Sequence, residues 1–247
     1  MPTGLYEHPA WQAVPDQAMR PGGLALTRQA LSYFDLMPDA RILDVGCGAG
    51  GTLNYLTAQG ERIGFGIDVS LELLRRARRN QSIAGFSCAR VECLPLQDTS
   101  IDVILAECTL SIFEIETALH ECARTLKPGG FLITSDLYAR NENGKDALRQ
   151  LPVGACISSA MSQAQVLEKI TRCGMDVLLW QDCSEKLKEF PITTLINTAE
   201  VDPFDLHIAA ARARIGYYLL VARKVRDSFQ GRRGGFSCGS HSFFAIG

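Results

Sequence analysis

Residues 41–52 read Arg-Ile-Leu-Asp-Val-Gly-Cys-Gly-Ala-Gly-Gly-Thr, an apolar run that passes directly into a series of glycines. Such a run predicts a β-strand, a tight turn and the start of a helix. Glycines allow the sharp turn, and they allow a nucleoside-containing ligand to lie against main-chain atoms. Because Gly46, Gly48 and Gly51 also satisfy the dinucleotide pattern G-x-G-x-x-G, the turn alone does not identify the ligand.

Outward from this turn, short apolar strands alternate with helices. Strands are expected over residues 41–45, 62–67, 86–91, 101–106, 131–135, 175–181 and 216–225. Helices are expected over 22–36, 52–59, 71–80, 116–126 and 162–173, with a mostly helical stretch over 184–211. Residues 127–130 (Lys-Pro-Gly-Gly) are expected to form a turn, and residues 138–155 a loop. The alternation predicts an α/β fold with a parallel, doubly wound sheet.

The length and charge of the chain limit its class. With 247 residues, 47% of them hydrophobic, it is long enough for one sizeable α/β domain. We expect residues 1–22 to form an N-terminal lid segment, residues 23–226 the domain, and residues 227–247 a disordered tail rich in Gly, Ser and Arg. The net charge of −2 gives no general attraction to nucleic acid or to an anionic membrane.

Targeting and metal-binding signals are not found in the sequence. It has neither a basic-then-apolar N-terminal pattern nor an apolar run of membrane-spanning length. Its nine cysteines are scattered, with no Cys-x-x-Cys pair and no Cys/His cluster at zinc-ligand spacing. We therefore expect a cytoplasmic protein with reduced, mostly buried thiols and without a bound metal.

Two acidic residues narrow the choice of ligand. Asp44 lies two residues before the first glycine, where a carboxylate would repel a pyrophosphate and attract a cationic amino-acid group. Asp68 closes the next predicted strand, and it can accept hydrogen bonds from both hydroxyls of a ribose. Since dinucleotide enzymes also carry an acid like Asp68, that residue indicates a nucleoside without choosing the cofactor.

Two further segments complete a recognisable order. Leu94-Pro95 precedes Ser100-Ile101-Asp102, and residues 126–130 (Leu-Lys-Pro-Gly-Gly) precede the fifth predicted strand. With the glycine turn and Asp68, these segments resemble the class I S-adenosylmethionine-dependent methyltransferases. Within that family they are similar to small-molecule methyltransferases related to ubiquinone/menaquinone C-methyltransferases and arsenite methyltransferases. The resemblance implies a Rossmann-like, seven-stranded sheet, mostly parallel, in which strand 216–225 is antiparallel and lies beside the fifth strand.

The resemblance also implies the cofactor, S-adenosyl-L-methionine, and its contacts. These would be Asp44, Gly46, Cys47, Gly48, Gly50, Asp68, Val69, Glu92, Cys93, Leu94 and Glu107. The glycine turn would contact the methionine part, with Asp44 near the amino group. Asp68 would take the ribose hydroxyls, and Val69 would pack on the adenine. Residues 92–94 would lie against the other face of the adenine.

One position departs from the family. Members often carry Gly-Asp before residues 92–94, and that Asp binds the adenine amino group; this chain has Ala89-Arg90 instead. A guanidinium cannot accept that hydrogen bond. Either Glu92 or main-chain carbonyls take its place, or the adenine is held mainly by packing.

Candidate catalytic residues follow from the position of ligands in open parallel sheets, outside the carboxyl ends of the strands. A general base is sought at Glu107 and Asp136, which end the fourth and fifth predicted strands. Each carboxylate could instead hold backbone groups. Cys108 follows the fourth strand on the expected acceptor side. It is either an ordinary buried cysteine or, as in arsenite methyltransferases, a thiol for trivalent arsenic, for which Cys156 and Cys183 would be the available partners.

The N-terminal segment adds three residues to the candidate site. Tyr6, Trp11 and Arg20 would line it if this segment folds over the cofactor as a lid. The sequence thus predicts S-adenosylmethionine-dependent methyl transfer to a small-molecule acceptor, with neither nucleic acid nor membrane as partner. Two other classes stay open. A nicotinamide-dependent oxidoreductase is disfavoured by Asp44 and by the Lys-Pro-Gly-Gly segment, and an S-adenosylmethionine-binding protein without catalysis is excluded by no sequence feature.

Overall fold

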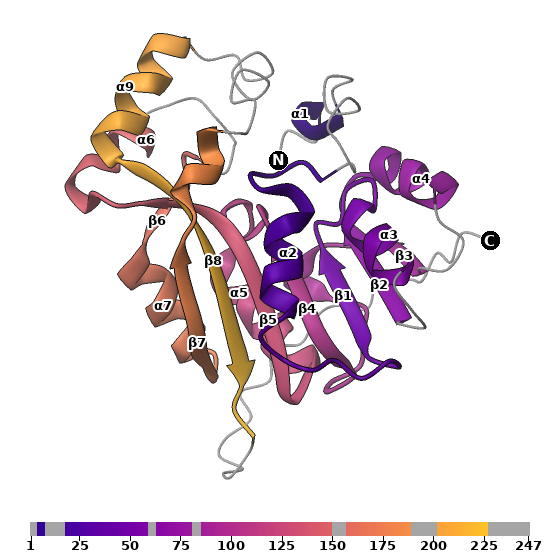
Figure 1. Cartoon of the computed structure of the whole chain (residues 1–247). Coiled ribbons are helices and arrows are strands. Elements are labelled where there is room, and N and C mark those ends of the chain that lie inside the picture. The colour runs from indigo at the N-terminus through magenta and orange to yellow at the C-terminus, as the bar shows by residue number, and fades with distance from the viewer. Residues whose placement is uncertain are drawn as a thin grey trace.

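A computed structural model of the chain describes residues 4–7, 18–58, 63–80, 85–149, 157–188 and 202–226. Its centre is one sheet with the strand order β3-β2-β1-β4-β5-β8-β7 (Figure 1). The strands are β1 (Arg41–Val45), β2 (Ile63–Asp68), β3 (Gly85–Cys88), β4 (Ile101–Glu107), β5 (Leu126–Ala139), β7 (Met175–Asp182) and β8 (Ile215–Lys224). A two-residue strand, β6 (Met161–Ser162), pairs with β5 outside this order.

The pairing of the strands confirms the expected architecture. Strands β3, β2, β1, β4 and β5 are parallel neighbours, whereas β8 runs antiparallel to both β5 and β7. The seven-stranded, mostly parallel sheet with its last strand beside the fifth is therefore confirmed, and β6 is a short addition. Strands β2 and β3 lie on one side of β1, and β4 and β5 lie on the other. The strand order thus reverses at β1, which is where ligands bind in open sheets of this kind.

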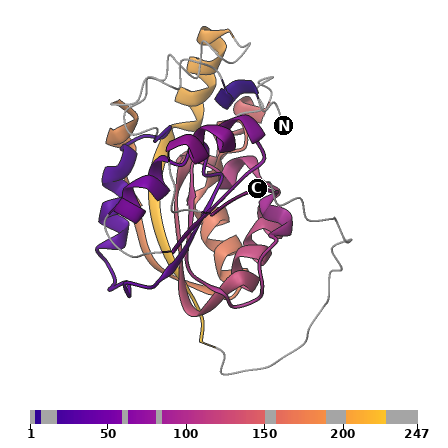
Figure 2. The same ribbon diagram turned by 90° about the vertical axis from the view of Figure 1, so that its right-hand side faces the viewer.

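Helices cover both faces of the sheet (Figure 2). They are α1 (Gly4–Glu7), α2 (Gly23–Leu31), α3 (Gly51–Ala58), α4 (Leu71–Asn80), α5 (Ile115–Thr125), α6 (Asp146–Arg149), α7 (Gln163–Arg172) and α9 (Pro203–Ala213). Short 3₁₀ turns are η3 (Val91–Cys93), η4 (Leu110–Ile112), η5 (Glu142–Gly144) and η6 (Ser184–Lys188). Within the described part of the chain, none of the helices combines the length and apolarity required to cross a membrane.

The core has two halves because neighbouring side chains of a strand point to opposite faces of the sheet. On one face, Ile42 of β1 packs with buried residues of α2, α3, α6 and α9. On the other face, Leu43 and Val45 pack with buried residues of α5 and α7. The interior strands β1 and β4 are therefore buried on both sides, and apart from Arg41 and Asp102 each of their residues is buried.

Some predicted element boundaries were wrong. Residues 127–130 do not form a turn that precedes a strand, because β5 already begins at Leu126 and continues to Ala139. Residues 138–149 are not simply a loop, since they contain the end of β5, η5 and α6. The first long helix ends at Leu31, and strand β3 ends at Cys88. Trp11, Cys156, the tail 227–247 and the stretch 189–201 lie outside the described residues.

Candidate functional site

A pocket lies at the carboxyl edge of the sheet, lined by residues at the ends of β1, β2 and β4 and by Tyr6, Met19 and Arg20 of the N-terminal segment. It encloses about 1110 Å³, a volume that includes space open to solvent. The predicted site residues that line it are Asp44, Gly46, Cys47, Gly48, Asp68, Val69, Glu107 and Cys108. Those that are not among its lining residues are Gly50, Glu92, Cys93, Leu94 and Asp136.

The turn after β1 has no room for a side chain at its first glycine. Gly46 has a φ of +72°, and a Cβ atom there would overlap the methyl group of Thr109. Gly48 and Gly50 also have positive φ values, +54° and +81°. The N–H groups of Gly46 and Cys47 donate to the carbonyl of Ile67, at 2.7 and 3.1 Å, so the turn is fixed against β2. Bare main chain therefore faces the pocket at this point.

Asp68 ends β2 and holds the turn from the other side. Its Oδ2 accepts the N–H of Gly48 at 2.8 Å, and its Oδ1 accepts the N–H of Ser70 at 2.8 Å. Burial raises the pKa of Asp68, and backbone hydrogen bonds from Ser70, Gly48 and Val69 act in the opposite direction. Because a carboxylate oxygen accepts more than one hydrogen bond, both oxygens can still receive a ligand hydroxyl.

A buried ion pair joins the N-terminal segment to the end of β4. Nη2 of Arg20 lies 2.8 Å from Oε2 of Glu107, and the two side chains are only 7% and 2% exposed. The hydroxyl of Thr27 accepts from Arg20 at 2.7 Å and donates to Oε1 of Glu107 at 2.7 Å. Thr52 donates to Oε2 of Glu107 at 3.2 Å. Both oxygens of Glu107 are thus engaged, and this residue holds Arg20 at the pocket wall.

Asp44 is buried beside that ion pair and also lines the pocket. Burial raises the pKa of Asp44 well above its ordinary value, the neighbouring Glu107 raises it further, and Arg20 lowers it. The described lining contains three acids, Asp44, Asp68 and Glu107, and one cation, Arg20. Its excess negative charge favours a ligand that carries a positive charge, because an opposite charge stabilises a buried carboxylate.

The wall after β3 is apolar. Ala89 and Val91 line the pocket, whereas the side chain of Arg90 is 61% exposed and pairs with Oε1 of Glu92 at 3.0 Å. The same oxygen of Glu92 accepts the N–H of Glu114 at 3.1 Å. Glu92 therefore links this segment to the start of α5. An adenine bound here would meet Ala89, Val91 and the main chain.

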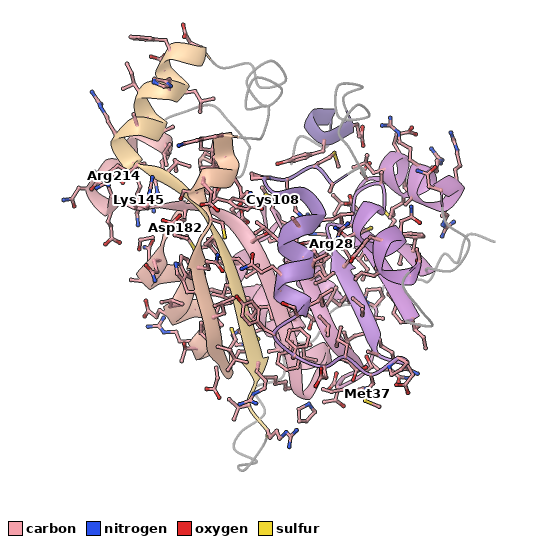
Figure 3. All side chains as sticks on the ribbon, in the orientation of Figure 1. Arg28, Met37, Cys108, Lys145, Asp182 and Arg214 are labelled. Atoms are coloured by element: carbon pink, nitrogen blue, oxygen red, sulfur yellow. The ribbon has the colours of Figure 1, made fainter. Side chains whose placement is uncertain are left out.

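Beyond the end of β4, the lining consists of Cys108, Thr109, Ile112 and Phe113. Cys108 lies at the carboxyl edge of the sheet, with Met37 at the opposite edge (Figure 3). Its backbone has a φ of +56°, and its Sγ lies 3.2 Å from the hydroxyl oxygen of Tyr217. None of these four side chains carries a formal charge, so this part of the pocket suits an uncharged group.

Neither of the partners proposed for Cys108 is found beside it among the described lining residues of the pocket. Cys183 is fully buried and is not a lining residue, and Cys156 lies outside the described residues. Cys47 does line the pocket, and burial raises its thiol pKa well above the ordinary value. The geometry therefore adds no support for an arsenite-type site at Cys108.

Asp136 is buried away from the pocket lining. Its Oδ2 accepts the N–H of Ser111 at 2.9 Å, and its Oδ1 accepts the hydroxyl of Ser111 at 3.0 Å and the N–H of Leu137 at 2.7 Å. Burial raises the pKa of Asp136 to about 6, against the effect of these hydrogen bonds. In this structure Asp136 fixes the η4 turn, and it is not among the residues that line the pocket.

We expect Asp136→Asn to lower stability and to leave cofactor binding unchanged. Both oxygens accept from main-chain N–H groups, so an amide would have to turn its NH₂ toward one of them. A buried donor without an acceptor costs about 1–3 kcal/mol. Urea unfolding should show a loss of that size, while calorimetric binding of S-adenosylhomocysteine changes less than about twofold. The exposed Asp98→Asn should cost under about 1 kcal/mol. Unchanged stability with lost turnover would instead make Asp136 a catalytic residue.

Several lining residues were not singled out from the sequence. Ile112 and Phe113 follow β4 closely, so their position after a strand end was the available signal. Thr27 does not line the pocket but donates a hydrogen bond to Glu107, and the sequence pattern indicated its role less clearly. It lies three residues after Leu24 and four before Leu31, on the predicted apolar side of α2, and it is fully buried. A polar residue at such a position needs a buried partner.

Comparisons with known proteins agree with this geometry. Residues 43–134 match a family model described as a methyltransferase domain. An uncharacterized methyltransferase of Bacillus subtilis (strain 168), YodH, is 34% identical over 117 residues, which cover 46% of this chain and 50% of YodH. The chain spans half or less of the length of the first curated relatives it matches.

Solved structures match over more of the chain. The [4+2]-cyclase SpnF is 26% identical, with a TM-score of 0.66 over 82% of this chain and 81% of SpnF. A phosphoethanolamine N-methyltransferase 2 of Haemonchus contortus, in complex with S-adenosyl-L-methionine, has a TM-score of 0.63 over 83% of this chain and 54% of its own. At 16% identity, that second structure shows a shared fold.

Proposed function

We propose that this chain, which belongs to the class I S-adenosylmethionine-dependent methyltransferases, transfers the methyl group of S-adenosylmethionine to a small-molecule acceptor. The observation that carries the proposal is the pocket at the reversal point of the sheet. There the bare turn at Gly46 and Gly48 lies between the carboxylates of Asp44 and Asp68. An acid on each side of the turn suits a cationic nucleoside and does not suit a pyrophosphate.

The residues present fit this cofactor. Asp68 would bind the ribose hydroxyls, Asp44 the ammonium group, and Ala89 and Val91 the adenine. When bound, S-adenosylmethionine supplies a methyl group on a sulfonium, and loss of the positive charge drives the transfer. The task of the protein is then to hold the acceptor in line, at about 3–3.5 Å from the methyl group, since positioning alone removes several kcal/mol of barrier.

The acceptor we propose is small and largely uncharged at its reacting end. Cys108, Ile112 and Phe113 form the wall that remains once the charged residues are assigned to the cofactor. The N-terminal segment, which contributes Tyr6 and Met19, would act as a lid that excludes water. A cytoplasmic location and the lack of a nucleic-acid substrate remain part of the proposal. The net charge of −2 supports the second, because it gives no general attraction to nucleic acid.

The first test is differential stabilisation by ligands. At one hundred times its Kd, S-adenosylhomocysteine should add about 2.7 kcal/mol of stability, which raises the Tm of a chain of this size by about 5–10 °C. NAD at the same concentration should leave the Tm unchanged. A shift with NAD and none with S-adenosylhomocysteine would end the methyltransferase proposal.

A second candidate, cofactor binding without methyl transfer, is favoured by one comparison, because SpnF is named as a [4+2]-cyclase. Release of S-adenosylhomocysteine from S-adenosylmethionine separates the two. A panel of apolar phenols, enols and amines should give release that depends on the acceptor. Tight binding of S-adenosylmethionine with no release on any acceptor would support the second candidate.

A further inference from the structure

Arg20 has one hydrogen-bond donor that the described structure leaves without a partner. The residue lines the pocket and is only 8% exposed. Its Nη2 is used by Glu107 and Thr27, but its buried Nε–H has no acceptor among the described residues. A buried, unsatisfied donor on a cation is costly, so such a group is expected to meet an acceptor when a ligand binds.

The chemistry of that acceptor follows from the surroundings. A guanidinium N–H forms a charge-assisted hydrogen bond with a carboxylate. Because Nη2 of Arg20 already serves Glu107 and Thr27, its Nε–H would make one such bond. The pocket also holds Asp44, and the charge of Arg20 acts on Asp44 directly. The pocket wall therefore presents the Arg20 cation, which is paired with Glu107, next to the second carboxylate of Asp44. This pattern is complementary to a zwitterion, whose carboxylate would face Arg20 and whose ammonium would face Asp44.

We propose that Arg20 binds the carboxylate at the amino-acid end of the cofactor, and that Glu107 is the positioning residue that holds Arg20 there. The inference rests on the proposed cofactor and deepens it. It also gives the ion pair a purpose, since Thr27 and Thr52 fix Glu107 from two helices and thereby fix the guanidinium. A carboxylate on the acceptor would have the same chemistry, so the test must separate these two sources.

Decarboxylated S-adenosylmethionine separates them, because it keeps the adenosine, the sulfonium and the amine and lacks only the carboxylate. The readout is the ratio of its Kd to that of S-adenosylmethionine, measured by calorimetry at neutral pH without acceptor. We expect a ratio of about ten for the wild type, as for one charge-assisted contact, and a ratio of about one for Arg20→Met. Decarboxylated S-adenosylmethionine carries one more net positive charge, so the ratio is also measured at raised salt, which screens a general attraction of cations more than a buried contact.

Two further variants protect the test against misfolding. The double variant Arg20→Met, Glu107→Gln removes the unpaired buried charge that the single variant leaves, and its ratio should also be about one. Arg79→Met, on the exposed side of α4, is the matched control and should keep the ratio of about ten. A wild-type ratio near one, or an unchanged ratio in folded Arg20→Met, overturns the assignment. Failure of both ligands to bind the wild type would instead refute the proposed function.

Discussion

Gly46→Ala is expected to lower the free energy of unfolding by at least about 2 kcal/mol and to abolish measurable cofactor binding. Two effects add. A residue with a Cβ atom at a φ of +72° is strained by roughly 1–2 kcal/mol. The added methyl would also overlap the methyl group of Thr109, which is held in place because its hydroxyl donates to the carbonyl of Val45 at 3.2 Å. Relief of that overlap moves the turn against which the methionine part should lie.

Two companion variants separate the strain from the overlap. Gly174→Ala has a similar φ, +75°, but nothing lies within 4 Å of its new Cβ atom, so it should show the cost of strain alone. Thr109→Ser in the Gly46→Ala background removes the obstructing methyl and keeps the hydroxyl. Gly46→Ala should lose more stability than Gly174→Ala, and Thr109→Ser should restore most of that difference. Urea unfolding measures all of them. If Gly46→Ala and Gly174→Ala lowered the free energy of unfolding equally, the overlap with Thr109 would contribute nothing to the loss of stability.

The fold was readable from the sequence wherever a local pattern and the tertiary pairing agree. Residues 41–45 and 71–80 were predicted to the residue, because an apolar run and a strongly amphipathic helix each have clear ends. The start of β5 was missed because Pro128 and Gly129 are local stop signals. In the sheet, Leu126 nevertheless pairs with Ile101, and the pairing register shifts before Val103. Such an irregularity accommodates the proline and glycine within a strand, and only the partner strand reveals it.

The candidate site could be predicted only in part, because some of its contacts depend on tertiary pairing that local patterns do not show. The glycine turn, Asp44 and Asp68 follow strands directly, so their place at the sheet edge could be predicted. Asp136 was expected to end a strand, but β5 continues to Ala139. Because Glu107 is in register with Ser135, the next residue, Asp136, points to the other face of the sheet. No local pattern could show that Glu107 pairs with Arg20, because 87 positions separate them in the sequence.

Asp68→Ala is expected to weaken binding of S-adenosylhomocysteine about a hundredfold. The proposed contacts are two charge-assisted hydrogen bonds to the ribose, each worth roughly 1.5–3 kcal/mol if lost. The variant also frees the N–H groups of Gly48 and Ser70, so the turn itself would loosen. Asp68→Asn keeps one carbonyl acceptor and should lose less, about tenfold. Calorimetry with each variant, with Tm as a check on folding, measures the losses.

The pH dependence of affinity tests whether the charged carboxylate of Asp68 contributes to cofactor binding. Because burial raises the pKa of Asp68, its carboxyl takes up a proton at a higher pH than an ordinary Asp does. Protonation removes the charge of the carboxyl and turns one oxygen into a donor, so its contacts with the ligand hydroxyls weaken. Wild-type affinity should therefore fall on acidification through that range and stay constant above it. The amide of Asp68→Asn does not take up a proton in this pH range. The affinity of that variant should therefore lack the decline caused by protonation of Asp68, while a decline caused by protonation of Asp44 remains. If the wild type and Asp68→Asn lost affinity in parallel, the charge of Asp68 would not contribute to binding and the proposed ribose contact would be wrong.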